Sequence, residues 1–171
     1  LNNEPVSPWY RRIRFVGEPR NDEQVVNDNQ ASSSILPILK DPGFKGMPIK
    51  EIAWHLMDYW NALYRLYPEC NNSPSSFSMM RRPGLPALNR LFTVIYTQAA
   101  REGKVTEDML YRILSRLQTE TPDHDVPEFR PALDSSFWGL KTGPEIATNP
   151  TQTNAKALFE NLTEKLWLAD S

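Results

Sequence analysis

The feature that most constrains the fold is an apolar repeat in residues 49–67. Apolar side chains recur there at intervals of three and four residues, and polar side chains fill the positions between them. This spacing is typical of an amphipathic α-helix that lays its apolar face on a core. The sequence therefore predicts a helix over residues 49–67, ended by Pro68, with Leu56 and Trp60 buried near the centre of the domain.

The same repeat predicts further helices on both sides of this one. A short helix is expected at about residues 33–40, after a polar loop, and a longer one at about residues 85–101. A third follows Thr106, whose hydroxyl is suited to capping its amino end. Gly103 makes the turn between these two, which should lie antiparallel or crossed. A last helix covers about residues 153–168.

The prediction for the whole chain is a mostly α fold of about four to five helices. Its 15 prolines against 7 glycines indicate long, rigid, irregular connections. Three parts are expected: an irregular basic segment at 1–34, a helical core at 35–118, and a linker rich in proline and aspartate at 119–171 whose helix packs on the core. With 171 residues, the chain is long enough to bury such a core.

The charge is unevenly distributed. The net charge is −2, which argues against nucleic-acid contacts over the whole surface. Residues 1–101 hold twelve Lys and Arg against nine Asp and Glu, a balance of +3, and residues 102–171 hold seven against twelve, a balance of −5. The first part can therefore carry a basic strip.

Several features bear on the compartment. Cys70 is the sole cysteine, so no disulfide can form within the chain, which fits a reducing environment. No apolar run approaches the roughly 20 residues that span a bilayer, and the first residues lack the features of a signal peptide. We expect a cytoplasmic protein without membrane contact. Because Leu1 is not a methionine, we also expect a fragment of a longer protein.

Few residues suggest catalysis. Glu51, His55 and Asp58 share one helix face and could present three metal ligands, although solvated ion pairs explain the same spacing. His124 lies in the acidic run 123–125, where a metal or general-base role competes with an ordinary exposed loop. No phosphate-binding glycine loop, CxxC pair or nucleophilic-serine motif occurs. We therefore expect no catalytic residue, metal or cofactor in this segment.

Two arginines precede a helix start. Arg81 and Arg82 stand before Pro83 and Gly84, and Arg90 would extend the basic surface along the helix. A helix amino end attracts anions because free N–H groups and the positive end of the dipole converge there. On this interpretation Arg81 and Arg82 meet phosphate beside the N–H groups of residues 85–88. The alternative is a solvated loop whose arginines pair with carboxylates.

A second basic run could join this surface. Arg11, Arg12 and Arg14 follow Trp9 and Tyr10, whose rings could stack on bases. The candidate residues for nucleic-acid binding are therefore Arg11, Arg12, Arg14, Arg81, Arg82 and Arg90.

The order of several segments resembles that of DGQHR-domain proteins, which include the DndB-like proteins linked to DNA phosphorothioation. The family's SPWY and RIR segments appear at residues 7–10 and 12–14, and its FNA-type helix ending in FPE appears at 59–63 and 67–69. Its glycine-led helix start appears as Gly84 with residues 87–88 and 90–91. The resemblance covers most of residues 1–101 and returns weakly at 152–162.

Two departures limit what the resemblance implies. The DGQHR motif itself is absent, and in the family it lies upstream of SPWY in a ParB-like α/β part, so Leu1 would begin after it. Pro83 replaces the usual threonine before the helix glycine. The resemblance implies the helical carboxy-terminal part of a larger bacterial protein that acts in DNA modification, its regulation or defence. Any enzymatic activity would depend on the upstream part, and the implied partners are DNA, that upstream part or other modification-system proteins.

Two other functions remain open. The chain could be a helical protein–protein interaction module without DNA contact, using an aromatic surface around Trp54, Tyr59, Phe137 and Trp138. It could also belong to an enzyme whose catalytic residues lie outside this segment.

Overall fold

The computed structural model describes residues 2–19, 21 and 23–169, and the expected mostly α fold is confirmed there. The helices are α1 (Asp28–Lys40), α2 (Ile49–Leu66), α3 (Pro68–Asn72), α4 (Gly84–Arg101), α5 (Glu107–Leu114), α6 (Glu145–Thr148) and α7 (Gln152–Leu168). Two short parallel strands, β1 (Ile13–Arg14) and β2 (Val26–Asn27), pair Ile13 with Val26. None of the helices in this described part has the length and apolar character needed to cross a membrane.

The connections between the helices contain single turns of 3₁₀-helix, as the proline content suggests. These are η1 (Pro42–Phe44), η2 (Pro74–Ser76), η3 (Ser115–Gln118), η4 (Pro127–Phe129) and η5 (Ser135–Trp138). Proline occupies the first position of η1, η2 and η4, where a missing N–H removes no hydrogen bond.

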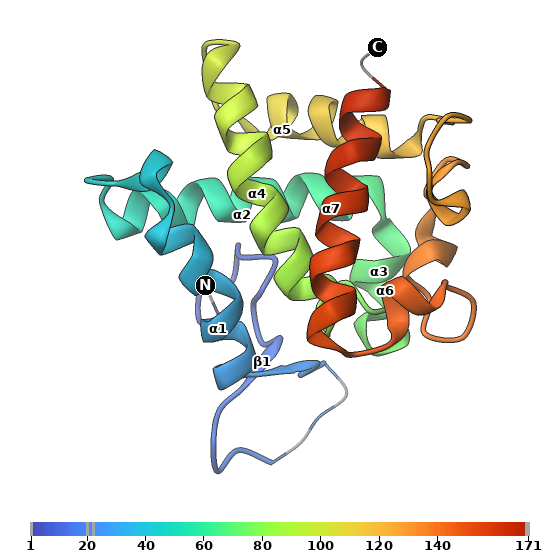
Figure 1. Ribbon diagram of the computed structural model, residues 1–171. Coiled ribbons are helices and arrows are strands. Elements are labelled where there is room, and N and C mark those ends of the chain that lie inside the picture. The colour runs from blue at the N-terminus through green and yellow to red at the C-terminus, as the bar shows by residue number, and fades with distance from the viewer. Residues whose placement is uncertain (1, 20, 22, 170–171) are drawn as a thin grey trace.

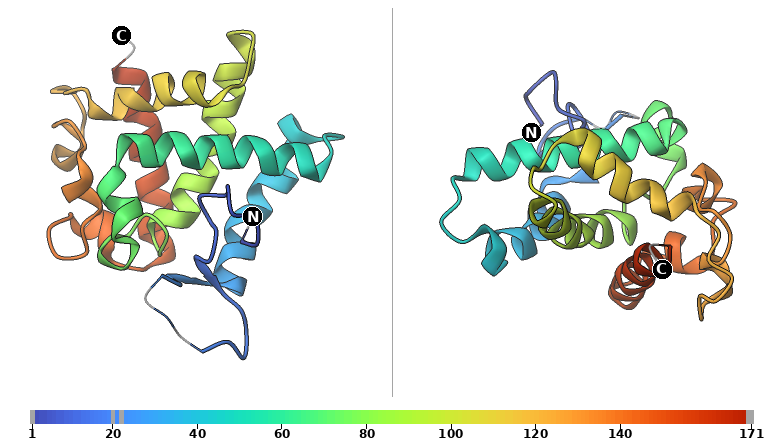
Figure 2. Two further views of the ribbon diagram at one scale, coloured as in Figure 1. Left: turned by 180° about the vertical axis from the view of Figure 1, so that it is seen from behind. Right: turned by 90° about the horizontal axis from the view of Figure 1, so that it is seen from above.

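The helices form two layers. Figure 1 shows α1, α4 and α7 in front, running in broadly the same direction with their amino ends at the lower edge, and α2 and α5 behind them. The view from behind in Figure 2 brings α2 and the amino-terminal segment to the viewer. Helix α5 crosses α4 after a turn at Gly103, which has a positive φ of 114° that glycine adopts without strain.

The helix α2 lies against the core, as its apolar repeat predicts. Leu56 and Trp60 are both buried. One hydrophobic cluster includes Trp9, Leu63 and Leu162, so all three expected parts of the chain contribute to the same core. The three parts therefore pack together rather than forming separate cores.

The helix α1 begins five residues earlier than the expected Ser33. The side chain of Asn27 accepts a hydrogen bond from the Gln30 N–H at 2.8 Å, and the Gln30 side chain accepts one from the Asn27 N–H at 3.4 Å. This reciprocal capping box satisfies N–H groups that the first turn would otherwise leave without partners. The later part of the polar run expected to be a loop, residues 28–34, is therefore the first half of a helix.

The segment between α5 and α7 is wrapped around a buried lysine. Lys165, fully buried on α7, donates from Nζ to the carbonyl oxygens of Thr119, Phe129 and Pro131 and to the Thr121 hydroxyl, at 2.7–3.1 Å. Burial lowers the pKa of Lys165 to about 8, because removal from water penalises the charged form. This one side chain ties the expected linker to α7.

Candidate nucleic-acid interface

A groove of about 410 Å³ lies between α1 and α7, over the first turns of α4. We call it the basic groove, because three cationic side chains line it: Arg82, Arg90 and Lys156. None of the described residues that line it carries a carboxylate. An anion that enters therefore meets positive charge without a competing acid in the wall.

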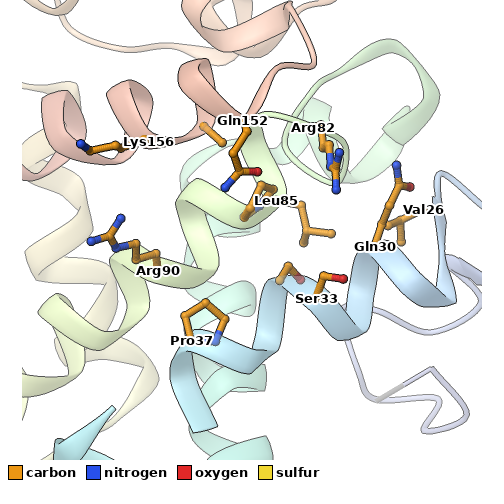
Figure 3. Close-up of a pocket in the computed structure, with 12 residues that line it drawn as sticks. Val26, Gln30, Ser33, Pro37, Arg82, Leu85, Arg90, Gln152 and Lys156 are labelled. Carbon is orange, nitrogen blue, oxygen red and sulfur yellow. The ribbon is translucent and has the colours of Figure 1, made fainter. Parts of the chain in front are cut away.

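The cations stand at two ends of the groove (Figure 3). Arg82 projects at one end, on the side of Gln30 from α1, and Arg90 and Lys156 project at the other, with Leu85 and Gln152 between. The side chains between the charged ends are apolar or neutral and polar. This arrangement suits an elongated ligand with anionic groups and an uncharged middle.

The groove exists because α1 and α7 pack on either side of α4 without closing over it. Pro86 and Arg90, four residues apart, lie on the uncovered face of α4, whereas Leu85, Leu88 and Leu91 are buried beneath. The α4 start is held by close packing: a β-carbon at Gly84 would lie 2.3 Å from the Ser78 carbonyl oxygen. Glycine is therefore required where α4 enters the fold.

The backbone also contributes positive potential. The groove is lined in part by residues from the first turns of α1, α4 and α7, whose amino ends lie at one edge of the molecule. Each helix dipole is positive at its amino end. Asn27 and Thr151 cap α1 and α7 by accepting N–H groups of Gln30 and Asn154. Each cap satisfies one N–H of its helix end, and the field of the helix dipole remains.

Two contacts orient the cations of α4 and α7. The Arg90 guanidinium lies over the ring of Phe159, 4.2 Å from the ring centroid, which is a cation–π contact across the two helices. Lys156 Nζ lies 3.7 Å from Glu160 Oε1 in an exposed pair one turn apart. Exposed pairs of this kind contribute little, so Lys156 remains able to meet an anion.

The expected phosphate site at the N–H groups of residues 85–88 is wrong in its geometry. The Leu85 N–H donates to the Arg81 carbonyl at 2.7 Å, the Ala87 N–H donates to the Pro83 carbonyl at 3.3 Å, and Pro86 has no N–H. Arg81 is half-buried, with Nε inside the protein, and does not line the groove. Arg82 is exposed and points into the groove, so the two neighbours differ in role.

The upstream arginines do not line the basic groove. Arg12 donates from Nη2 to the backbone and side-chain oxygens of Asn71 at 3.0 and 3.2 Å, which fixes the amino-terminal segment to α3. Arg11 lies over the ring of its neighbour Tyr10, 5.0 Å from the centroid, and Arg14 is half-buried on β1. The expected common basic surface of six arginines therefore reduces to Arg82 and Arg90.

Trp9 was expected to offer a stacking face and does not. It is buried, and its ring meets the ring of Trp60 edge-on with centroids 5.6 Å apart. The expected aromatic surface for a protein partner is also wrong for three of its four residues, because Tyr59, Phe137 and Trp138 are buried in the core. Of that set, Trp54 is exposed.

The histidines have structural surroundings. His55 is half-buried, with its ring against Tyr96 and Nε2 3.9 Å from Glu51 Oε1. Burial is the main cause of a raised pKa at Asp58. Across residues 2–19, 21 and 23–169, no group of three or more His, Cys, Asp or Glu side chains is placed to hold a metal ion.

The expectation of an exposed loop at His124 is wrong. The ring is fully buried and stacks on Phe129 with centroids 5.3 Å apart. Its Nδ1 accepts the Val126 N–H at 3.0 Å, so Nε2 carries the proton and donates to the Asn161 carbonyl at 3.1 Å. This neutral ring joins the 119–131 segment to α7.

Of the three cations that line the basic groove, Lys156 is the one that the sequence alone did not identify. It lies 66 residues after Arg90, and its place beside Arg90 follows from the packing of α7 on α4. No local pattern links the two positions. The chain matches no family model, no curated protein and no solved structure.

Proposed function

We propose that this chain binds the phosphate backbone of nucleic acid through the basic groove. The observation that carries the proposal is the convergence of Arg82, Arg90 and Lys156 from two distant parts of the sequence, with no carboxylate among the described lining residues. The resemblance to DGQHR-domain proteins supports DNA as the nucleic acid. On this proposal the chain is the helical part of a bacterial, cytoplasmic protein of DNA modification, its regulation or defence.

The chemistry of the groove fits backbone contact rather than base reading. Arginine presents a planar fork that can donate two hydrogen bonds to one phosphate, and lysine acts as a compact point charge. Contacts to phosphate fix position and orientation but carry no sequence information directly. We therefore expect similar affinity across DNA sequences.

The test is the salt dependence of DNA binding by the double variant Arg82→Ala/Arg90→Ala. Between about 50 and 200 mM salt, the slope of log K against log salt for duplex DNA should be shallower than that of the wild type, by roughly 0.9 for each phosphate that the variant no longer neutralises. The reduction in affinity should be about equal for unrelated DNA sequences.

A matched control removes the same amount of charge elsewhere. Lys50 and Lys104 are exposed and lie outside the basic groove. The variant Lys50→Ala/Lys104→Ala should keep the wild-type slope more closely than the groove variant does. Arg81→Ala should also keep it, because Arg81 does not line the groove. Equal slopes for the wild type and the groove variant would refute the proposal.

A protein partner is the second candidate function. It is favoured by apolar exposure at the start of α2, where Ile49 is 74% and Trp54 50% exposed. These two residues lie outside the basic groove, so the two functions have different surfaces. Trp54→Ala would weaken a protein complex through this surface and leave DNA binding unchanged.

A further inference from the structure

A second hollow lies further along the same helix, α4. That hollow, of about 290 Å³, lies over the later turns of α4 and is lined by Thr93, Thr97, Arg101 and, from α7, Trp167. Thr93 is three residues after Arg90, and its hydroxyl donates to the Arg90 carbonyl at 3.0 Å. We call the basic groove and this second hollow together the α4 furrow.

Cations recur along the α4 furrow. Arg82 and Arg90 line its first part and Arg101 lines its last part. Arg90 and Arg101 are eleven residues apart, which is roughly 16 Å along the helix axis. Asp41 also lines the last part, so this end of the furrow holds a carboxylate as well as Arg101, and Asp41 Oδ1 accepts the Gly43 N–H at 2.8 Å as the cap of η1.

An aromatic ring of α7 stands beside these cations. Trp167 is 44% exposed and lines the same hollow as Arg101. Proteins that bind single strands combine a basic groove along the backbone with aromatic rings on which bases stack. The α4 furrow has both components.

The furrow suits a single strand better than a duplex. A groove that is basic along its length and has an aromatic ring in its wall can take in one strand with its bases unpaired. In the basic groove the walls are supplied by α1 and α7, with Arg90 on α4 between them, and these two helices would keep a duplex at the rim. We propose that one strand of nucleic acid lies along the α4 furrow, with its phosphates at Arg82, Arg90 and Arg101 and a base stacked on Trp167.

This inference rests on the proposed function and specifies its ligand. The 18 residues of α4 span about 27 Å, which corresponds to at most about eight nucleotides, counted at the 3.4 Å spacing that one strand has in a duplex. A labelled oligonucleotide of about 12 nucleotides, single-stranded or paired with its complement, is therefore a sufficient probe. The 171-residue chain should bind the single strand roughly tenfold or more tightly than the duplex, measured by fluorescence anisotropy.

Trp167→Ala provides the specific test. It should weaken single-strand binding by roughly fivefold to 150-fold, the range for removal of one stacked base, and leave duplex binding unchanged. Trp167→Phe should restore most of the affinity because it restores a stacking face. Trp54→Ala removes an equally exposed tryptophan outside the furrow and is the matched control, with no expected effect on either probe.

The outcomes separate this inference from the proposed function. Duplex binding as tight as single-strand binding, with no effect of Trp167→Ala, would overturn the inference. The proposed function would still stand if Arg82→Ala/Arg90→Ala weakened duplex binding. Absence of binding to both probes would overturn both.

Discussion

The indole N–H of Trp60 donates to the side-chain carbonyl of Asn89 at 2.9 Å inside the core. The Asn89 amide donates in turn to the Ser34 hydroxyl at 2.8 Å, and that hydroxyl donates to the Ala31 carbonyl at 2.7 Å. A buried chain of hydrogen bonds therefore joins α2, α4 and α1. It holds the α1 wall of the basic groove against the helix that carries Arg90.

Asn89→Ala should break this chain. The Trp60 indole would lose its acceptor in a place that water does not reach, and an unsatisfied buried group costs about 1–3 kcal/mol. Urea unfolding should show at least that decrease in the free energy of unfolding. Asn29→Ala, an exposed change on α1, should stay within about 0.5 kcal/mol. Equal effects of the two substitutions would contradict a structural role for the chain.

Leu56→Ala tests the core face of α2. Leu56 is 2% exposed, and truncating a buried leucine costs roughly 2–5 kcal/mol in the free energy of unfolding. Ile49→Ala removes a branched side chain from the exposed start of the same helix and should cost no more than about 0.5 kcal/mol. A decrease below about 1 kcal/mol for Leu56→Ala would mean that this face is not the core face.

Lys165 should make stability depend on pH in the alkaline range. Burial lowers its pKa to about 8 from an ordinary value of 10.5, so between these values the unfolded chain binds more protons than the folded one. Stability from this group therefore rises with pH across that window. The unfolding free energy of the wild type minus that of Lys165→Met should be constant below pH 7 and increase from about pH 8 to pH 10. A difference that does not change with pH would disprove the lowered pKa.

Cys70 should be unreactive in the folded chain. Burial raises the pKa of its thiol to about 12, and the thiolate is the nucleophile. At about pH 8, alkylation by iodoacetamide should be roughly 100-fold or more slower in the folded chain than in denaturant, followed by mass spectrometry. Comparable rates in the two states would show that the α3 region opens readily.

The local part of this fold follows from the sequence. The apolar repeat predicts α2, α4 and α7 to within two residues at each end, because each buries one face on a common core. Thr106 caps α5 as its position predicts, accepting the Met109 N–H at 3.3 Å. The early start of α1 was readable in principle from the spacing of Asn27 and Gln30, but the polar run around them gave no apolar repeat.

Long-range contacts account for what the sequence did not predict. Lys165 lies within the apolar stripe of α7 and is buried because residues 119–131 supply its acceptors. The sequence suggests a surface cation at Arg12, but in the fold its guanidinium donates to Asn71, 59 residues later. The basic groove also depends on a long-range contact, because the packing of α7 on α4 brings Lys156 beside Arg90. Composition and spacing carry no information about such partners.

Residues 119–131 do not line the basic groove. They surround Lys165 of α7, however, and so hold the α7 wall of the groove in place. A protease cut or an inserted tag in this loop would loosen four hydrogen bonds to α7 at once. Helix α7 carries Lys156 and Trp167, so damage far from any nucleotide would open the furrow. Dividing the chain at this apparent linker would thus separate the two sides of one binding surface instead of yielding two working pieces.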